Sequence, residues 1–164
     1  MPRNMPAQRP GNSKQDYQTP PEFIRAVLDR LHSESFVWDL AADADNTVVP
    51  RCFFSEREDA LAQSWANVST SRWMWLNPPF SIIAPWVEKA WMESQLGGAH
   101  IAMLVPASVG SNWWRDWVHD KAHVLLLNGR LTFVGHEDPY PKDCALLLYT
   151  PFINGGYESW TWNP

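Results

Sequence analysis

The chain has 164 residues, 45% of them hydrophobic, and a formal net charge of −5. This length predicts one domain that buries a core without disulfides or a structural metal. The acidic balance argues against a protein that holds nucleic acid mainly through phosphate contacts, and no apolar run reaches the length of a membrane span.

The cysteine and histidine content argues against metal and disulfide sites. The two cysteines, Cys52 and Cys144, are far apart in the sequence, so they form neither a disulfide framework nor a pair of metal ligands. They favour a reducing, cytoplasmic setting. The five histidines are scattered, and we expect no metal site. His136 is expected at the surface.

The first predicted element is a helix that follows a polar tail. Residues 1–15 predict a flexible tail, which leaves residues 16–164 as the single domain. Thr19-Pro20-Pro21-Glu22 is typical of a helix start, with Thr19 able to cap the helix and proline in its first turn. One apolar face of this helix comprises Phe23, Ile24, Val27, Leu28 and Leu31.

The elements that follow alternate between strands and helices. Their expected ranges are a strand at 36–38, a short helix at 60–65, a strand at 73–76, a helix at 84–96, a strand at 101–105, a helix at 113–119, and strands at 124–127, 131–134, 145–149 and 157–162. The alternation predicts an α/β fold with a mostly parallel sheet and helices on both faces. The last segments lack helical connections, which predicts an antiparallel edge.

Aromatic and basic residues in the second half of the chain are candidates for contacts to nucleic acid. Most of the 11 tryptophans are expected in the core, but Trp113 and Trp114 follow a loop, where an indole ring could stack on a base. Arg115 and Arg130 could line a basic face. Arg130 could equally pair with carboxylates of the sheet.

The tetrapeptide Asn77-Pro78-Pro79-Phe80 carries the main functional hypothesis. It follows the apolar run Trp73–Leu76, and open α/β sheets bind ligands at the carboxyl ends of their strands. The side-chain oxygen of Asn77 and the backbone carbonyl of Pro78 can both accept hydrogen bonds from a planar amine, while two prolines keep the turn rigid. Phe80 offers a ring for stacking. These features predict the active site of an amino-group methyltransferase. The alternative is a proline-rich turn whose asparagine bonds its own backbone.

Several segments in this order resemble the phage-type DNA N-6-adenine methyltransferase (Dam-like) family, from Asp16 to about Tyr149. The matching segments are Gln18-Thr19-Pro20-Pro21-Glu22, Trp38-Asp39-Leu40-Ala41-Ala42, Pro50-Arg51 with Phe53-Phe54, Asp59-Ala60-Leu61-Ala62-Gln63-Ser64-Trp65, Asn77-Pro78-Pro79-Phe80, Trp86-Val87-Glu88-Lys89-Ala90 and Gly129-Arg130-Leu131-Thr132-Phe133.

The resemblance implies a compact, Rossmann-like fold and methyl transfer from S-adenosylmethionine to a flipped adenine of double-stranded DNA. Asn77, Pro78, Pro79 and Phe80 would form the catalytic site. The implied cofactor-binding residues are Tyr17, Gln18, Thr19, Pro20, Asp39, Ala41 and Asp59. Asp59 would face an adenine edge, of either the cofactor or the target, or would be a plain helix cap. The implied DNA contacts are Trp113, Arg115 and Arg130.

The chain departs from the wider methyltransferase pattern in two ways. The cofactor loop, Asp39 to Asp43, contains no glycine, and we expect no separate target-recognition domain after the catalytic core. Selectivity would then come from short loops such as 106–114 or 138–142. Methylation of an RNA base or a protein glutamine, or an inactive nucleic-acid-binding relative, are the competing hypotheses. No feature of the sequence indicates an oligomeric state.

Overall fold

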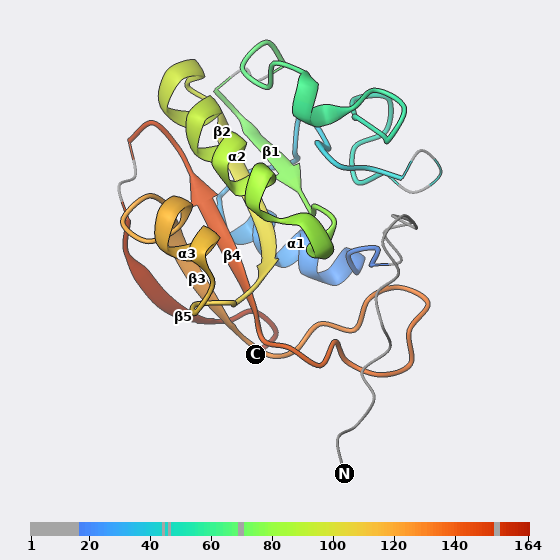
Figure 1. Ribbon diagram of the computed structural model, residues 1–164. Coiled ribbons are helices and arrows are strands. Elements are labelled where there is room, and N and C mark those ends of the chain that lie inside the picture. The colour runs from blue at the N-terminus through green and yellow to red at the C-terminus, as the bar shows by residue number, and fades with distance from the viewer. Residues whose placement is uncertain (1–16, 44, 46, 69–70, 153–154) are drawn as a thin grey trace.

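Helices cover both faces of a single sheet of five strands (Figure 1). The computed structural model describes residues 17–43, 45, 47–68, 71–152 and 155–164. The expected tail, residues 1–15, lies outside these residues. The α/β class and the layered arrangement predicted from the sequence are confirmed. Among the described helices, none is long and apolar enough to cross a membrane.

The elements fall close to their predicted positions. The strands are β1 (Trp73–Leu76), β2 (His100–Pro106), β3 (His123–Asn128), β4 (Cys144–Tyr149) and β5 (Tyr157–Thr161). The helices are α1 (Pro21–Arg30), α2 (Ala84–Gly97) and α3 (Asn112–Trp117), with 3-10 turns η1 (Ala60–Ala62) and η2 (Phe80–Ile82). Gly98, with φ of 72°, ends α2 in the left-handed conformation that glycine tolerates.

The strand order, β1-β2-β4-β3-β5, places the antiparallel strand inside the sheet. β1 pairs with β2, and β3 with β5, in parallel, while β4 is antiparallel to both β2 and β3. The sheet is mostly parallel, as predicted, but the predicted antiparallel edge is wrong. β4 follows β3 through a long loop and inserts between β2 and β3, and the edge strand β5 runs parallel to β3.

Alternate residues of the strands supply two separate cores. In β1, Met74 packs under α2, whereas Trp75 faces α1 with Phe23 and Val27. The same alternation in β2 places Met103 on the α2 side and Leu104 on the α1 side. Period-two alternation of apolar residues on both faces is expected of a strand that is covered on both sides.

A segment before β1 widens the sheet without forming a regular strand. Asp39 makes isolated parallel bridges to Trp75 on one side and to Phe53 on the other, and the Leu40 N–H donates to the Trp75 carbonyl at 2.9 Å. The strand expected at 36–38 is therefore reduced to a few backbone hydrogen bonds. It still places Asp39 beside the carboxyl end of β1.

Two further predicted elements are shorter than expected or absent. The helix expected at 60–65 is the single turn η1, which ends because Gln63 is extended, with φ −91° and ψ 155°. The indole N–H of Trp65 donates to the Ala60 carbonyl from outside the turn. The strand expected at 131–134 is irregular. Residues 129–143 instead form a long loop between β3 and β4, closed by the Tyr140 N–H donating to the Leu131 carbonyl at 2.7 Å.

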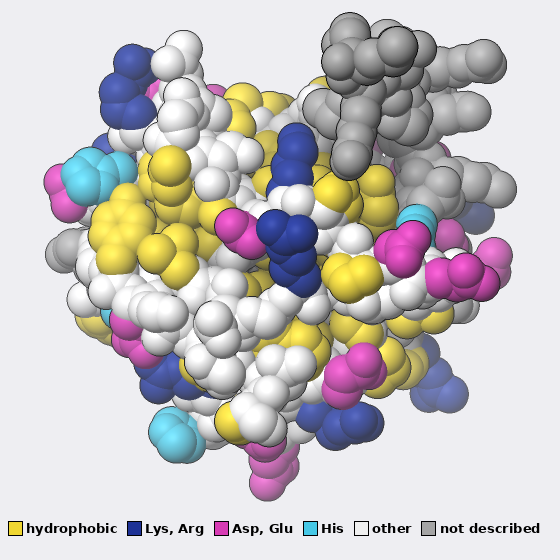
Figure 2. Space-filling model, turned by 90° about the horizontal axis from the view of Figure 1, so that it is seen from below, with side chains coloured by type: hydrophobic (Ala, Val, Ile, Leu, Met, Phe, Trp, Pro, Cys, Tyr) yellow, Lys and Arg dark blue, Asp and Glu magenta, His cyan; other side chains and the backbone are white. Residues whose placement is uncertain are grey.

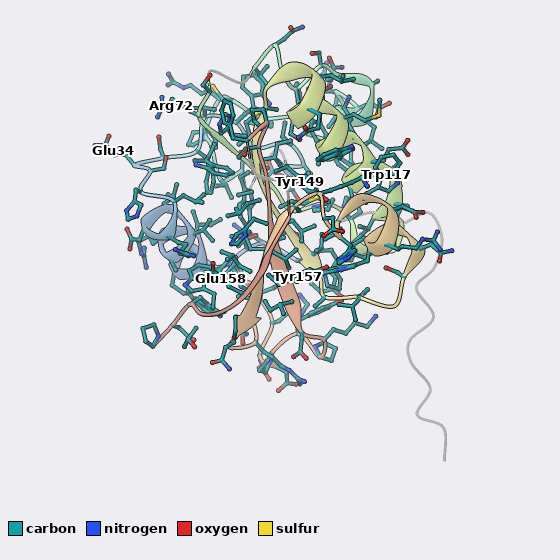
Figure 3. The ribbon with its side chains drawn as sticks, turned by 90° about the vertical axis from the view of Figure 1, so that its left-hand side faces the viewer. Glu34, Arg72, Trp117, Tyr149, Tyr157 and Glu158 are labelled. Carbon is teal, nitrogen blue, oxygen red and sulfur yellow. The ribbon has the colours of Figure 1, made fainter. Side chains whose placement is uncertain are left out.

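A buried tyrosine fastens α3 to the sheet. The hydroxyl of Tyr149, at the end of β4, donates to the carbonyl of Trp117 at 2.7 Å (Figure 3), and burial raises the pKa of Tyr149 above its ordinary value. All eleven tryptophans are at least partly buried, with Trp65, Trp75, Trp86 and Trp114 in the cores. The other seven are half-buried and pack against the cores. The expectation that most tryptophans are core residues therefore holds fully for only four, and Trp114, a candidate for stacking on a base, is one of these buried rings.

The two cysteines are expected to differ sharply in reactivity. Burial raises the pKa of the Cys144 thiol to about 12, with a smaller contribution from Asp143, so only about one thiol in 10,000 is ionised at pH 8. Cys52 is half-buried and Cys144 is buried. We expect iodoacetamide at pH 8 to alkylate Cys52 and to spare Cys144, as measured by peptide mass spectrometry. Comparable labelling of both cysteines without denaturant would contradict this placement.

Candidate functional site

The candidate site lies where the order of the parallel strands reverses. From the Asp39 segment the chain passes to Phe53 on one side, whereas from β1 it passes to β2 on the other. Ligands of open α/β sheets bind outside the carboxyl ends of the strands at such a reversal. Asp39 lies at the carboxyl end of the segment on one side of this reversal, and Asn77 follows the carboxyl end of β1 on the other side. Both positions at strand ends were predicted from the sequence.

Asn77 is buried and its amide nitrogen faces the segment before α1. Its Nδ2 donates to the Tyr17 carbonyl at 2.8 Å and to the Thr19 Oγ1 at 3.0 Å. A carbonyl oxygen only accepts hydrogen bonds, so the nitrogen must be the atom that faces Tyr17. The side-chain Oδ1 therefore points away from the segment of Tyr17 and Thr19. The alternative interpretation, an asparagine that bonds only its own turn, is wrong, because both bonds reach residues outside that turn.

The rest of the tetrapeptide continues from this buried point to the surface. Pro78 is buried, and Pro79 and Phe80 are half-buried. Pro79 has φ −59° and ψ 121°, an extended conformation that turns the chain into η2. Because the proline rings fix φ, the position of Phe80 relative to Asn77 is set by a stiff connection.

Phe80 belongs to an aromatic cluster that the sequence did not predict. The Tyr17 ring stacks on Phe80, with 5.8 Å between ring centroids and 18° between planes, and on His136, with 5.6 Å and 24°. Tyr140 meets Tyr17 edge-on at 5.4 Å, and Phe133 lies 5.1 Å from Tyr17. His136 is exposed, as expected, but its ring takes part in the stack.

The 129–143 loop supplies three of these five rings. Its Val134 N–H donates to the Gln18 carbonyl at 3.0 Å, which fixes the loop against the segment before α1. Burial raises the pKa of Tyr140 to about 12, with smaller contributions from Cys144 and Tyr17, so its hydroxyl is neutral at physiological pH. Fifteen irregular residues between two paired strands are a signal of function, which the predicted strand at 131–134 obscured.

Asp39 organises the loop that follows it. Its Oδ2 accepts from the Val48 N–H at 2.8 Å and the Thr47 hydroxyl at 3.3 Å, and its Oδ1 accepts from the Ala41 N–H at 3.3 Å. Burial raises the pKa of Asp39, while these hydrogen bonds oppose the rise. The carboxylate thus fixes the glycine-free loop, including Ala41, at the carboxyl edge of the sheet.

Asp59 is exposed and stands in the left-handed conformation, with φ of 50°. Its side chain makes no capping hydrogen bond to η1, so the expectation of a plain helix cap is wrong. Aspartate tolerates this conformation better than most residues, and such backbone positions concentrate at functional sites.

The three residues expected to contact nucleic acid are partly or fully exposed. The Trp113 ring is half-buried and lies 5.7 Å from that of Trp114. Arg115 pairs with Asp116 at 2.7 Å, and Arg130 with Asp143 at 3.4 Å, which is the alternative partnership considered for Arg130. Exposed ion pairs contribute little to stability because solvent screens them, so neither pair prevents an arginine from turning to another anion.

The lower face of the molecule carries charges of both signs. In Figure 2 basic and acidic side chains are interspersed there with hydrophobic ones. The visible part shows no continuous basic surface, in keeping with the net charge of −5. Among the residues that the structure describes, no cluster of three or more His, Cys, Asp or Glu side chains could hold a metal ion.

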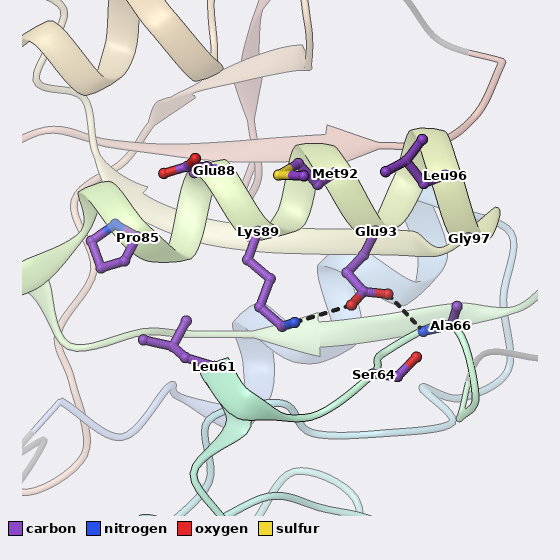
Figure 4. A pocket seen from close by; sticks show the side chains of 10 residues that line it. All are labelled: Leu61, Ser64, Ala66, Pro85, Glu88, Lys89, Met92, Glu93, Leu96 and Gly97. Carbon is purple, nitrogen blue, oxygen red and sulfur yellow. Dashed lines mark hydrogen bonds and ion pairs between the residues drawn. The ribbon is translucent and has the colours of Figure 1, made fainter.

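A groove of about 490 Å³ lies away from the predicted residues, between α2 and the η1 region (Figure 4). The Lys89 Nζ and Glu93 Oε1 atoms pair across one turn of α2 at 3.0 Å, and the Ala66 N–H donates to Glu93 at 3.0 Å. None of the predicted site residues lines this groove. The Glu93 carboxylate thereby holds α2 to the chain around Ala66.

Comparison with known proteins places these features in one family. A family model described as DNA N-6-adenine-methyltransferase (Dam) matches residues 7–152. A DNA N-6-adenine-methyltransferase of Haemophilus phage HP1 is 26% identical over 145 residues, which cover 85% of this chain and 81% of that protein. One from Escherichia phage T1 is 29% identical over 139 residues, which cover 85% of this chain and 54% of that protein. No solved structure matches.

Proposed function

Because the chain belongs to the DNA N-6-adenine-methyltransferase (Dam) family, we propose that it methylates the exocyclic amine of adenine in double-stranded DNA, with S-adenosylmethionine as methyl donor. The orientation of Asn77 is the observation that supports this proposal most directly. Two acceptors hold its Nδ2, so its Oδ1 is directed to the other side, where an amine can donate to it.

Asn77 and Pro78 act on the nucleophile. The lone pair of the adenine amine is delocalised into the ring, which makes the amine a poor nucleophile. Hydrogen bonds from its two N–H groups to the Asn77 Oδ1 and the Pro78 carbonyl favour a tetrahedral nitrogen. A preorganised acceptor of this kind lowers the barrier by about 3 kcal/mol. The nitrogen loses its proton after the new bond has formed, so no general base with a matched pKa is needed.

The segments assigned to the cofactor converge on the same strand ends. Tyr17 and Thr19 contact Asn77 directly, and the Asp39 carboxylate holds the neighbouring loop. This arrangement fits S-adenosylmethionine, which when bound supplies an electrophilic methyl group on a sulfonium. Gln18 and Pro20 would hold its amino-acid end and Ala41 its adenosine, whereas the Thr19 hydroxyl is engaged with Asn77. The exposed Asp59 carboxylate would accept from an adenine amine.

The aromatic cluster provides the surface for a flipped base. An adenine amine is paired inside a duplex, so the base must leave the stack before it can reach Asn77. Phe80 would stack on the base. Trp113, Arg115 and Arg130 would contact the surrounding DNA, the arginines by exchanging Asp116 and Asp143 for phosphates.

Transfer of tritium from labelled S-adenosylmethionine to unmethylated duplex DNA tests the function. We expect label in DNA, recovered as N-6-methyladenine on digestion and mass spectrometry. Duplex DNA already methylated on adenine serves as the control and should accept less label. Label found in RNA or in protein glutamine instead would show that the same site methylates a different acceptor. Failure to bind the cofactor in calorimetry would contradict the proposal and favour an inactive DNA-binding relative.

Removing the ring of Phe80 should weaken the use of DNA more than the binding of cofactor. Stacking is worth about 1–3 kcal/mol per base, so we expect Phe80→Leu to lower kcat/KM for DNA by roughly 10-fold to 100-fold. Leucine keeps apolar volume against Tyr17, whereas Phe80→Tyr keeps the ring and should stay close to wild type. Steady-state kinetics at saturating cofactor measure this. Equal kcat/KM in the leucine and tyrosine variants would remove Phe80 from the base site.

A further inference from the structure

Thr19 makes a contact that neither of its predicted roles explains. It is buried, with 5% of its surface exposed, and it precedes α1. The N-cap of α1 is Pro20, with no side-chain capping bond, so the hydroxyl does not cap the helix as the sequence suggested. Instead its Oγ1 accepts from the Nδ2 of Asn77, across 58 positions of sequence.

The Tyr17 carbonyl determines which way the Asn77 amide faces, and the Thr19 hydroxyl adds a second acceptor on the same side. The nitrogen carries two N–H donors, and the Tyr17 carbonyl and the Thr19 hydroxyl accept one each. Rotating the amide by half a turn would bring Oδ1 against the Tyr17 carbonyl, where two acceptors face one another. A buried polar group without a partner is costly, so the observed orientation is favoured.

We propose that Thr19 is a positioning residue, whose hydroxyl locks the amide of Asn77 with Oδ1 turned toward the target amine. The inference rests on the proposed function of Asn77. A β-branched side chain has restricted rotation about χ1, so threonine holds its hydroxyl in place before the substrate arrives. Preorganisation of the acceptor is what makes the acceptor effective.

Thr19→Val and Thr19→Ser separate this role from cofactor contact. Valine has nearly the same shape and lacks the hydroxyl, whereas serine keeps it. We expect Thr19→Val to lower the single-turnover rate at saturating cofactor and DNA by about 10-fold, with the Kd of S-adenosylmethionine unchanged in calorimetry and with serine restoring most of the rate. A weakened Kd with an unchanged saturated rate would instead make Thr19 a cofactor residue and overturn the proposal.

A double-mutant cycle tests whether Thr19 acts through Asn77. Once Asn77→Ala has removed the amide, Thr19→Val should cost no further activity. An equal additional loss in both backgrounds would show an independent role and would also overturn the proposal.

A measurement that does not depend on catalysis tests this inference separately from the proposed function. In nitrogen-15 NMR the side-chain amide of Asn77, identified by its loss in Asn77→Ala, should exchange its hydrogens slowly in wild type and in Thr19→Ser, and faster in Thr19→Val. If wild type methylated no DNA but showed this pattern, the proposed reaction would fail while the amide lock stood. Equal exchange in all three proteins would refute the lock, whatever the activity.

Discussion

Replacing Asn77 by alanine is expected to lower the rate of methyl transfer by at least about 100-fold, because it removes an acceptor worth about 3 kcal/mol in the transition state. The Kd of S-adenosylmethionine should stay close to the wild-type value, since the proposed role of the side chain is toward the amine. Single-turnover transfer measures the first quantity and calorimetry the second.

Two further variants sharpen this experiment. Asn77→Asp places a carboxylate oxygen opposite the Tyr17 carbonyl, where the native Nδ2 donates at 2.8 Å, so it should be as inactive as alanine despite its similar shape. Asn112→Ala is the matched control, because Asn112 is an exposed asparagine at the start of α3. Normal turnover in Asn77→Ala, or a comparable loss in Asn112→Ala, would contradict the role given to Asn77.

The sequence predicted those parts of the fold in which buried residues form a recognisable local pattern. The run His100–Pro106 is almost wholly buried, and a continuous apolar run that ends in proline indicates an interior strand. The Asn-Pro-Pro-Phe motif could be placed for the same reason, since it directly follows the buried strand β1. The position of Asn77 at a carboxyl strand end therefore followed from the sequence alone.

Partners that are distant in the sequence explain most of the errors. Leu131 and Phe133 are buried and alternate with exposed residues, which is the pattern of a strand. They are buried because the loop folds against Tyr17 and Phe80, and their alternation has no neighbouring strand to pair with. Tyr17, in turn, precedes the first helix by only a few residues, where nothing in the local pattern indicates that it reaches the 129–143 loop.

The hydrogen bond between Thr19 and Asn77 is another contact between residues that are distant in the sequence. The sequence offered two local explanations for Thr19, a cap and a cofactor contact, because both depend on its immediate neighbours. The observed bond joins the start of α1 to the end of β1 and exists only because α1 packs on the face of the sheet that carries Trp75. Local sequence patterns identified both residues as candidates but could not show that they contact each other.

The same packing predicts that Trp75 dominates the stability of this region. Its ring is 1% exposed and lies 5.4 Å from Phe36 and 6.3 Å from Phe23 of α1. We expect Trp75→Ala to lower the free energy of unfolding by about 3–5 kcal/mol, through lost burial and the cavity that remains, and the Tm by roughly 10 °C for a chain of this size.

Denaturant and thermal unfolding of matched variants measure this effect. Phe152→Ala is the control, because Phe152 is 83% exposed and its removal should change the free energy of unfolding by less than about 0.5 kcal/mol. Trp75→Phe should fall between, since phenylalanine refills part of the space. A loss below about 1 kcal/mol in Trp75→Ala would show that α1 is not held on the sheet by this ring. The segment of Tyr17 and Thr19 that orients Asn77 would then need another anchor.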